Sequence, residues 1–129
     1  MKNALRSIFI ATIAALGVAS ASLPSNAAPR ANAFDGQWSV VIYTLRGDCN
    51  RALRYSLRIV NGRVQPEEQN YRAAGAVAAN GSVRVVVAEG GRSANGSGRL
   101  VGNSGRGWWR TDTGECSGQW TAARRMAEY

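Results

Sequence analysis

The fold class is decided by the stretch YSLRIVNGRVQ, residues 55–65. Apolar and polar side chains alternate along its first half, so Tyr55, Leu57 and Ile59 share one face of an extended strand. Asn61-Gly62 is the kind of residue pair that two-residue hairpin turns prefer, and the residues after it can pair back. The stretch therefore predicts two antiparallel strands joined by a tight turn.

The same period of two recurs along most of the chain, between turns marked by pairs such as Asn80-Gly81 and Gly90-Gly91. The predicted strands cover residues 38–44, 55–60, 63–65, 71–78, 82–88, 93–101, 107–111 and 116–123. A helical turn is expected at most over 122–129. About eight short strands without crossover helices predict an all-β fold, a small antiparallel up-and-down meander that closes, or nearly closes, into a barrel. A two-sheet β-sandwich is the alternative.

The start of the chain has the organisation of a secretory signal peptide. A basic start precedes an uncharged apolar run over 8–18, and small residues lead to a predicted cleavage after Ala27, with Ala21 or Ala33 as alternatives. The run is shorter than the roughly 20 residues that a membrane span needs, and no second run reaches that length. We therefore expect an exported protein, periplasmic or extracellular, without a transmembrane span once cleaved. The predicted organisation is a signal peptide (1–27), a flexible leader (28–33), one β domain (34–125) and a C-terminal tail (126–129).

The two cysteines favour closure of the barrel. An even number of cysteines in an exported chain predicts a disulfide, and two cysteines allow only the pair Cys49–Cys116; two free thiols are the alternative. Cys49 closely follows the first predicted strand, and Cys116 begins the last. In a closed meander the end of the first strand lies beside the start of the last. The predicted bridge therefore falls where closure would bring the two cysteines together.

The composition excludes several kinds of chemistry. The chain of 129 residues contains no His and only two Cys, which rules out a His-based triad, an imidazole zinc site and four-thiolate metal centres. All eight carboxylate side chains fall in or beside predicted turns, loops or the tail, and no pair of them has the arrangement of a glycosidase. Neither a phosphate-binding P-loop nor an Asp-rich calcium loop is present. We expect no enzymatic activity, no cofactor and no metal site.

The basic residues and one tryptophan indicate a surface that could bind a partner. Residues 28–129 contain 14 Arg, no Lys and eight acidic residues. Trp108 and Trp109 are adjacent and must face opposite sides of a strand; the charges that share a face with Trp108 place it outside and Trp109 inside. The strand pattern puts further arginines on outward faces, while Trp38 and Trp120 are expected in the core. The candidate binding residues are Arg106, Trp108, Arg110, Arg58 and Arg84.

Arginine suits contacts with phosphate, sulfate or carboxylate, so the expected partner is an anionic glycan, lipopolysaccharide or an acidic protein at the cell envelope. Export argues against nucleic acid. A merely solvated arginine-rich surface is the plainest alternative. A second is an inhibitor of an exported hydrolase, acting through residues 28–35 or 65–70. A third is a barrel that holds a small apolar ligand, although side chains are expected to fill so small a lumen. The oligomeric state stays open.

Five stretches carry a resemblance to a known group of proteins. They are Phe34-Asp-Gly-Gln-Trp-Ser-Val40, Cys49, Arg58-Ile-Val-Asn-Gly-Arg-Val64, Gly105-Arg-Gly-Trp-Trp-Arg110 and Cys116-Ser-Gly-Gln-Trp-Thr-Ala-Ala-Arg124. Together they resemble small exported one-disulfide proteins of Gram-negative proteobacteria, over most of the chain after the predicted signal peptide. That resemblance implies no activity. In layout the chain is also similar to avidin-like and calycin-like barrels, among them exported inhibitors of proteases or lysozyme, and this implies no binding residue.

Overall fold

The computed structural model of the chain describes Gly17 and residues 32–126. The described part contains eight strands: β1 (Gly36–Arg46), β2 (Ala52–Val60), β3 (Arg63–Pro66), β4 (Arg72–Val77), β5 (Ser82–Glu89), β6 (Arg92–Val101), β7 (Ser104–Thr111) and β8 (Ser117–Arg124). Apart from Gly17, the predicted signal peptide (1–27) lies outside the described residues, as do positions 28–31 of the predicted leader and 127–129 of the predicted tail.

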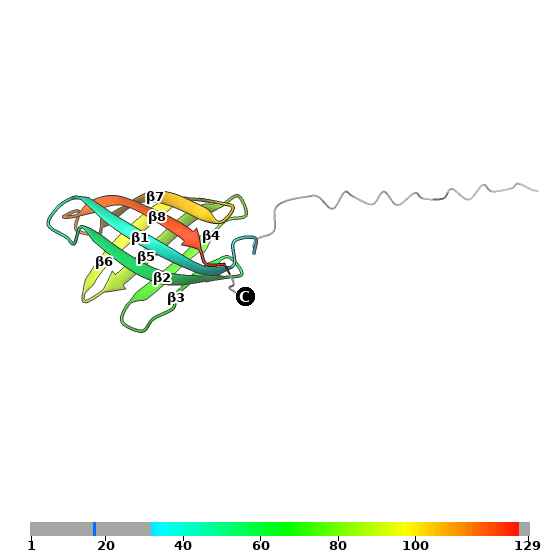
Figure 1. The fold of residues 1–129 in the computed structure, drawn as a ribbon, viewed down its shortest axis with the longest axis horizontal. Coiled ribbons are helices and arrows are strands. Elements are labelled where there is room, and N and C mark those ends of the chain that lie inside the picture. Colours follow the sequence, from blue (N-terminus) through cyan, green and yellow to red (C-terminus); the bar gives the residue numbers. More distant parts are fainter. Residues whose placement is uncertain (1–16, 18–31, 127–129) are drawn as a thin grey trace, which may run out of the picture.

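The strands form one closed barrel in which each strand pairs antiparallel with the next, and β8 pairs with β1 (Figure 1). The predicted all-β meander and its closure are thus confirmed, and the sandwich alternative is excluded. No helix occurs in the described residues, and hence none there is long and apolar enough to cross a membrane. The helical turn predicted over 122–129 is wrong for its first residues, because β8 stays paired with β1 as far as Arg124, opposite Trp38.

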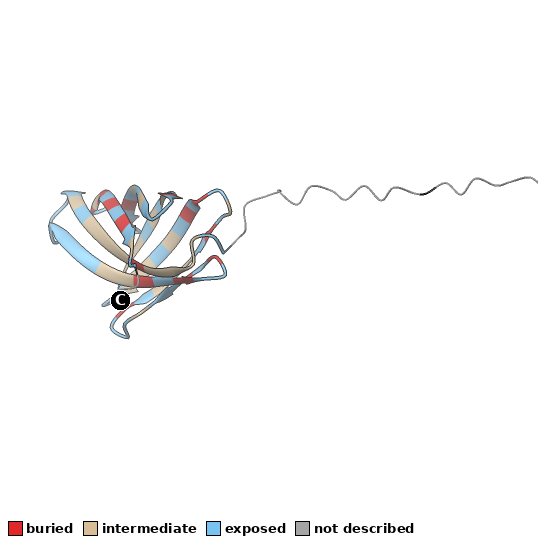
Figure 2. Cartoon of the chain, turned by 45° about the vertical axis from the view of Figure 1, so that its right-hand side comes forward, coloured by how far each residue is buried: buried red, intermediate tan, exposed pale blue. Residues whose placement is uncertain are grey.

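Bands of buried and exposed residues alternate along the strands (Figure 2), as the period of two requires when one face of each strand lines the lumen. The buried core consists of Trp38, Leu57, Ile59, Val64, Tyr71, Val77, Val83, Leu100, Trp109, Cys116, Trp120 and Ala122. Trp38 is the most deeply buried of the large side chains, and the predicted core positions of Trp38 and Trp120 are confirmed. The lumen therefore holds the hydrophobic core of the molecule.

Tight turns connect most neighbouring strands. Asn61 and Gly62 have φ values of 51° and 76°, as expected of the predicted two-residue hairpin turn between β2 and β3. The carboxylate of Asp35 accepts the backbone N–H of both residues, at 2.6 and 3.0 Å. The turn between β6 and β7 is shorter than the predicted separator of 102–105, because Ser104 already belongs to β7.

Arg124 closes one end of the barrel. It occupies an inward position, and its guanidinium lies over the ring of Trp38, 5.0 Å from the ring centre. It donates hydrogen bonds to the carbonyl oxygens of Asp35 (2.8 Å), Gly102 (3.1 Å) and Ala33 (3.3 Å). Ala33 belongs to the predicted leader, and here it forms part of a turn that packs over this end of the barrel.

The disulfide Cys49–Cys116 is formed, as predicted, with the two Cα atoms 6.2 Å apart. Cys49 lies in the connection between β1 and β2, and Cys116 directly precedes β8. The bridge therefore lies near the end of the barrel opposite to Arg124. A disulfide is consistent with an oxidising compartment.

Candidate binding surface

Strand β7 carries the centre of the candidate surface. Arg106, Trp108 and Arg110 occupy alternate outward positions, whereas Trp109 points into the lumen and donates its indole N–H to the carbonyl of Tyr43 at 2.9 Å. Trp108 is 61% exposed and Trp109 is 8% exposed. The predicted assignment of the two neighbouring tryptophans to opposite faces is confirmed.

The neighbours of Trp108 explain its exposure. Ser97 on β6 and Gln119 on β8 stand directly opposite it, and neither side chain is large enough to cover an indole. The backbone below is held from inside, because the indole N–H of Trp120 lies 3.2 Å from the carbonyl oxygens of both Ser97 and Trp108. A large aromatic side chain thus stands on a firmly supported strand and remains free for a partner.

A groove of about 810 Å³ runs along the outside of the barrel beside Trp108. It extends from the end of β1 to β4 and across β5–β8. Three arginines line it, Arg46, Arg84 and Arg110, together with the exposed apolar side chains of Leu45 and Val86. The groove therefore combines positive charge with apolar and aromatic contact area.

No carboxylate among the described residues lines this groove. The outward positions of β5–β8 likewise carry four arginines and no Asp or Glu: Arg84, Arg99, Arg106 and Arg110. Within the described part of the chain the only ion pair joins Arg58 and Glu67, at 3.8 Å. The positive charge of this face is therefore not neutralised by the protein itself, so it can attract anions over a distance of about 8–10 Å at ordinary salt.

The predicted site residues are brought together only in part. Arg84, Trp108 and Arg110 line the groove, and Arg106 stands next to it on β7, opposite Arg99. Arg58 lies on β2, separated from β7 by β8 and β1, and it pairs with Glu67 instead.

Two lining residues escaped the sequence analysis. Leu45 and Arg46 come directly after an irregularity in the pairing of β1 with β8 that begins at Thr44. A bulge of this kind breaks the alternation of faces, so no periodic signal could assign the side chains beyond it. The bulge turns Leu45 and Arg46 towards the groove, where they complete its end.

Three of the described carboxylates have hydrogen-bond partners within the fold. Asp35 accepts two backbone N–H groups, Glu89 accepts the hydroxyl of Tyr55 at 3.0 Å, and Glu67 accepts the amide of Gln37 at 3.1 Å. No group of three or more potential metal ligands occurs among the residues described. The groove offers guanidinium donors and an indole ring, which can bind anionic groups and stack on a flat ligand.

A scan against protein-family models gives no match for this chain, and a search of the curated proteins gives none either.

Proposed function

We propose that the protein is a non-catalytic, exported binding protein that contacts an anionic component of the cell envelope. The binding residues are Trp108, Arg84, Arg110 and Arg106, with Arg46 at the end of the groove. The observation that carries the proposal is an exposed indole beside arginines in a groove without a carboxylate. The predicted signal peptide and the disulfide support export.

The arginines and Trp108 of this surface lower the stability of the fold or add little to it, which also supports a binding role. Arg99 and Arg106 stand directly opposite each other on β6 and β7, and like charges in that position destabilise a sheet. Trp108 contributes little to the core, since most of its surface remains in contact with solvent. Residues that favour binding over stability are expected at a functional surface, and Trp and Arg are enriched among the residues that dominate binding energies.

The shape of the surface favours an extended ligand. The groove is open and crosses several strands, so a chain with repeated negative groups could contact several arginines in succession. Sulfate, phosphate and carboxylate groups all match the two-pronged geometry of a guanidinium. A sugar ring could stack on Trp108 between such contacts. An anionic glycan or the phosphorylated sugars of lipopolysaccharide therefore fit better than a single small anion.

Titration of the purified, oxidised protein with heparin, lipopolysaccharide and uncharged dextran tests this function. Binding to one of the two anionic probes is expected to weaken steeply as salt increases, and dextran should not bind. Trp108→Ala should reduce the affinity by roughly tenfold or more, the effect expected of a dominant contact. Arg84→Gln/Arg110→Gln should weaken binding and flatten its dependence on salt.

The matched control is Arg63→Gln/Arg72→Gln, which removes the same charge from exposed positions of β3 and β4 outside the groove lining. It should retain most of the affinity. Equal losses in the two double variants would mean that total charge, and not this surface, determines binding. A protein partner that stays bound at high salt, and that also binds the Trp108→Ala variant, would favour the hydrolase-inhibitor alternative. Residues 65–70 would then be the segment to substitute next.

A further inference from the structure

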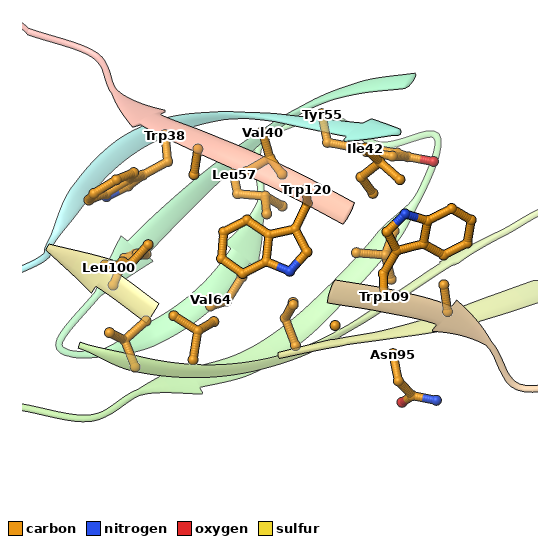
Figure 3. Close-up of a pocket in the computed structure, with 18 residues that line it drawn as sticks. Trp38, Val40, Ile42, Tyr55, Leu57, Val64, Asn95, Leu100, Trp109 and Trp120 are labelled. Atoms are coloured by element: carbon orange, nitrogen blue, oxygen red, sulfur yellow. The ribbon is translucent and has the colours of Figure 1, made fainter. Parts of the chain in front are cut away.

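The lumen of the barrel is not completely filled. A cavity of about 60 Å³ lies inside it, and valines of β5 are among the residues that line it. Trp109 and Trp120 also line it (Figure 3). One water molecule needs roughly 10–15 Å³ of such space, so the cavity is several times larger than a packing defect. The sequence-based expectation of a lumen filled by side chains is therefore not met. Since an engineered apolar cavity of about 150 Å³ holds benzene, we infer that this smaller cavity holds an apolar guest of only a few heavy atoms.

Glycines on one wall create the space. The inward positions of β6 and β7 include Gly96, Gly98 and Gly107, which contribute no side chain to the lumen. A Cβ atom at Gly98 or Gly107 would lie 2.6 Å from Cζ2 of Trp120, so the indole rests directly on this bare stretch of backbone. A Cβ atom would also clash with a backbone carbonyl oxygen of the paired strand, that of Arg106 for Gly98 and that of Ser97 for Gly107, so no larger residue fits at either position. The cavity is thus a consequence of particular residue choices on two neighbouring strands.

The wall of the cavity offers no free polar group. The indole N–H of Trp38 donates to the carbonyl of Phe34 at 2.8 Å, that of Trp109 to Tyr43, and that of Trp120 to the backbone of β6 and β7. Asn95 belongs to an outward position of β6, and its side chain points away from the cavity (Figure 3). A buried water needs two to four polar partners, and apolar cavities without them stay dry and accept apolar guests. The chemistry of the wall therefore selects an apolar occupant.

The cavity also has a way in. Arg124 and Phe34 cover one end of the barrel, whereas a second hollow of about 280 Å³ lies at the other end, near the disulfide. Five residues line both spaces and form the neck between them: Ile42, Tyr55, Val87, Ala94 and Trp109. Polar residues surround this outer hollow, among them Asp48, Asn50, Glu89 and Arg92. An apolar guest can enter through this mouth, and a single polar group on it could remain there.

Titration with xenon, followed by the NMR signals of the valine methyls and the tryptophan indoles, tests the inference. Saturable shifts confined to residues of the lumen are expected, such as Val85 and Trp120, with an affinity that does not depend on salt. Trp108→Ala should leave the binding of xenon unchanged, because that side chain lies outside the barrel. The experiments can therefore refute the proposed lumen site without refuting the proposed external binding surface, and the reverse.

Ala94→Leu, which narrows the neck and adds bulk at the edge of the cavity, should weaken xenon binding by about tenfold or more. Val85→Ile adds one methyl group to the wall and gives a second test if Ala94→Leu does not fold. The matched control is Ala123→Leu, an equal enlargement on the outward face of β8, which should bind like the wild type. Absence of saturable shifts, or shifts that persist unchanged in a folded lumen-filling variant, would overturn the inference.

Discussion

Tyr55 has the most strongly altered environment of the titrating side chains at the mouth of the barrel. Its phenol donates a hydrogen bond to Glu89 at 3.0 Å, and its ring meets the edge of Tyr71, with 5.0 Å between the ring centres. Burial raises the pKa of Tyr55 to about 12, and the hydrogen bond to Glu89, the charge of Glu89 and Tyr71 add to the effect. The folded state therefore favours the neutral phenol.

The pKa of Tyr55 predicts how stability depends on pH in alkaline solution. Because it is raised from 10.0 to about 12 on folding, its contribution is complete below pH 10 and is lost as the pH rises to about 12. Lys2 is the only lysine in the chain, so lysine side chains contribute little to the change in this window. Urea unfolding at a series of pH values should show a decline in the free energy of unfolding over this range.

Tyr55→Phe should make that decline shallower, with the remainder assigned to Tyr71, whose pKa burial also raises. Tyr43→Phe is the matched control, since it removes an exposed hydroxyl and should keep the decline. An unchanged pH profile in Tyr55→Phe would contradict the assignment.

At the scale of single residues, the sequence predicted the features that depend on alternation alone. The faces of Trp108 and Trp109 could be assigned because charged neighbours cannot line an apolar core. Arg124 shows the limit of that rule, since it occupies an inward position despite its charge. It is accommodated there by three backbone carbonyls and the face of Trp38, which only the assembled end of the barrel brings together.

At the scale of elements, the β2–β3 hairpin depends on a residue outside it. Asp35 precedes β1, yet its carboxylate holds both N–H groups of the turn at Asn61 and Gly62. Hydrogen bonds to a charged group contribute about 1.5–3 kcal/mol each to stability. Asp35→Ala removes two such bonds, one of them exposed to solvent, and should therefore lower the free energy of unfolding by about 3 kcal/mol, which urea denaturation can measure.

Asp48→Ala is the matched control for this element, because it removes a carboxylate from an exposed position in the β1–β2 connection. It should change the free energy of unfolding by less than about 0.5 kcal/mol. Equal effects of the two substitutions would show that net charge, rather than the clamp on the turn, explains the loss. Increased hydrogen exchange confined to the hairpin in Asp35→Ala would locate the effect.

The number and order of the strands could be predicted because turn residues and alternation are local signals. The existence of the groove could not, because it depends on a bulge in β1 that turns Leu45 and Arg46 towards strands from elsewhere in the chain. The same is true of the lumen cavity. Its volume depends on how the indole of Trp120 rests on glycines of two other strands.

At the scale of the whole molecule, the barrel is closed by the pairing of its first strand, β1, with its last strand, β8. Backbone pairing holds this seam along its length, and the disulfide Cys49–Cys116 links residues 67 positions apart near one end of it. Cys116 is also held by Thr111, whose hydroxyl accepts its backbone N–H at 3.1 Å. The seam thus has both covalent and non-covalent support.

The disulfide is expected to act mainly on the unfolded chain. Closing a loop of 67 residues removes conformational freedom worth about 4 kcal/mol, out of a total stability of roughly 5–15 kcal/mol for a small domain. Cys49→Ala/Cys116→Ala should therefore lower the free energy of unfolding by about that amount, while the circular dichroism of the folded state at low temperature stays the same. Urea denaturation of the double variant beside the reduced wild type measures the loss and shows whether the two agree. A variant without native circular dichroism would instead mean that the seam cannot close without the bridge, and that backbone pairing between β1 and β8 contributes less to closure than its regular register from Trp38 to Thr44 indicates.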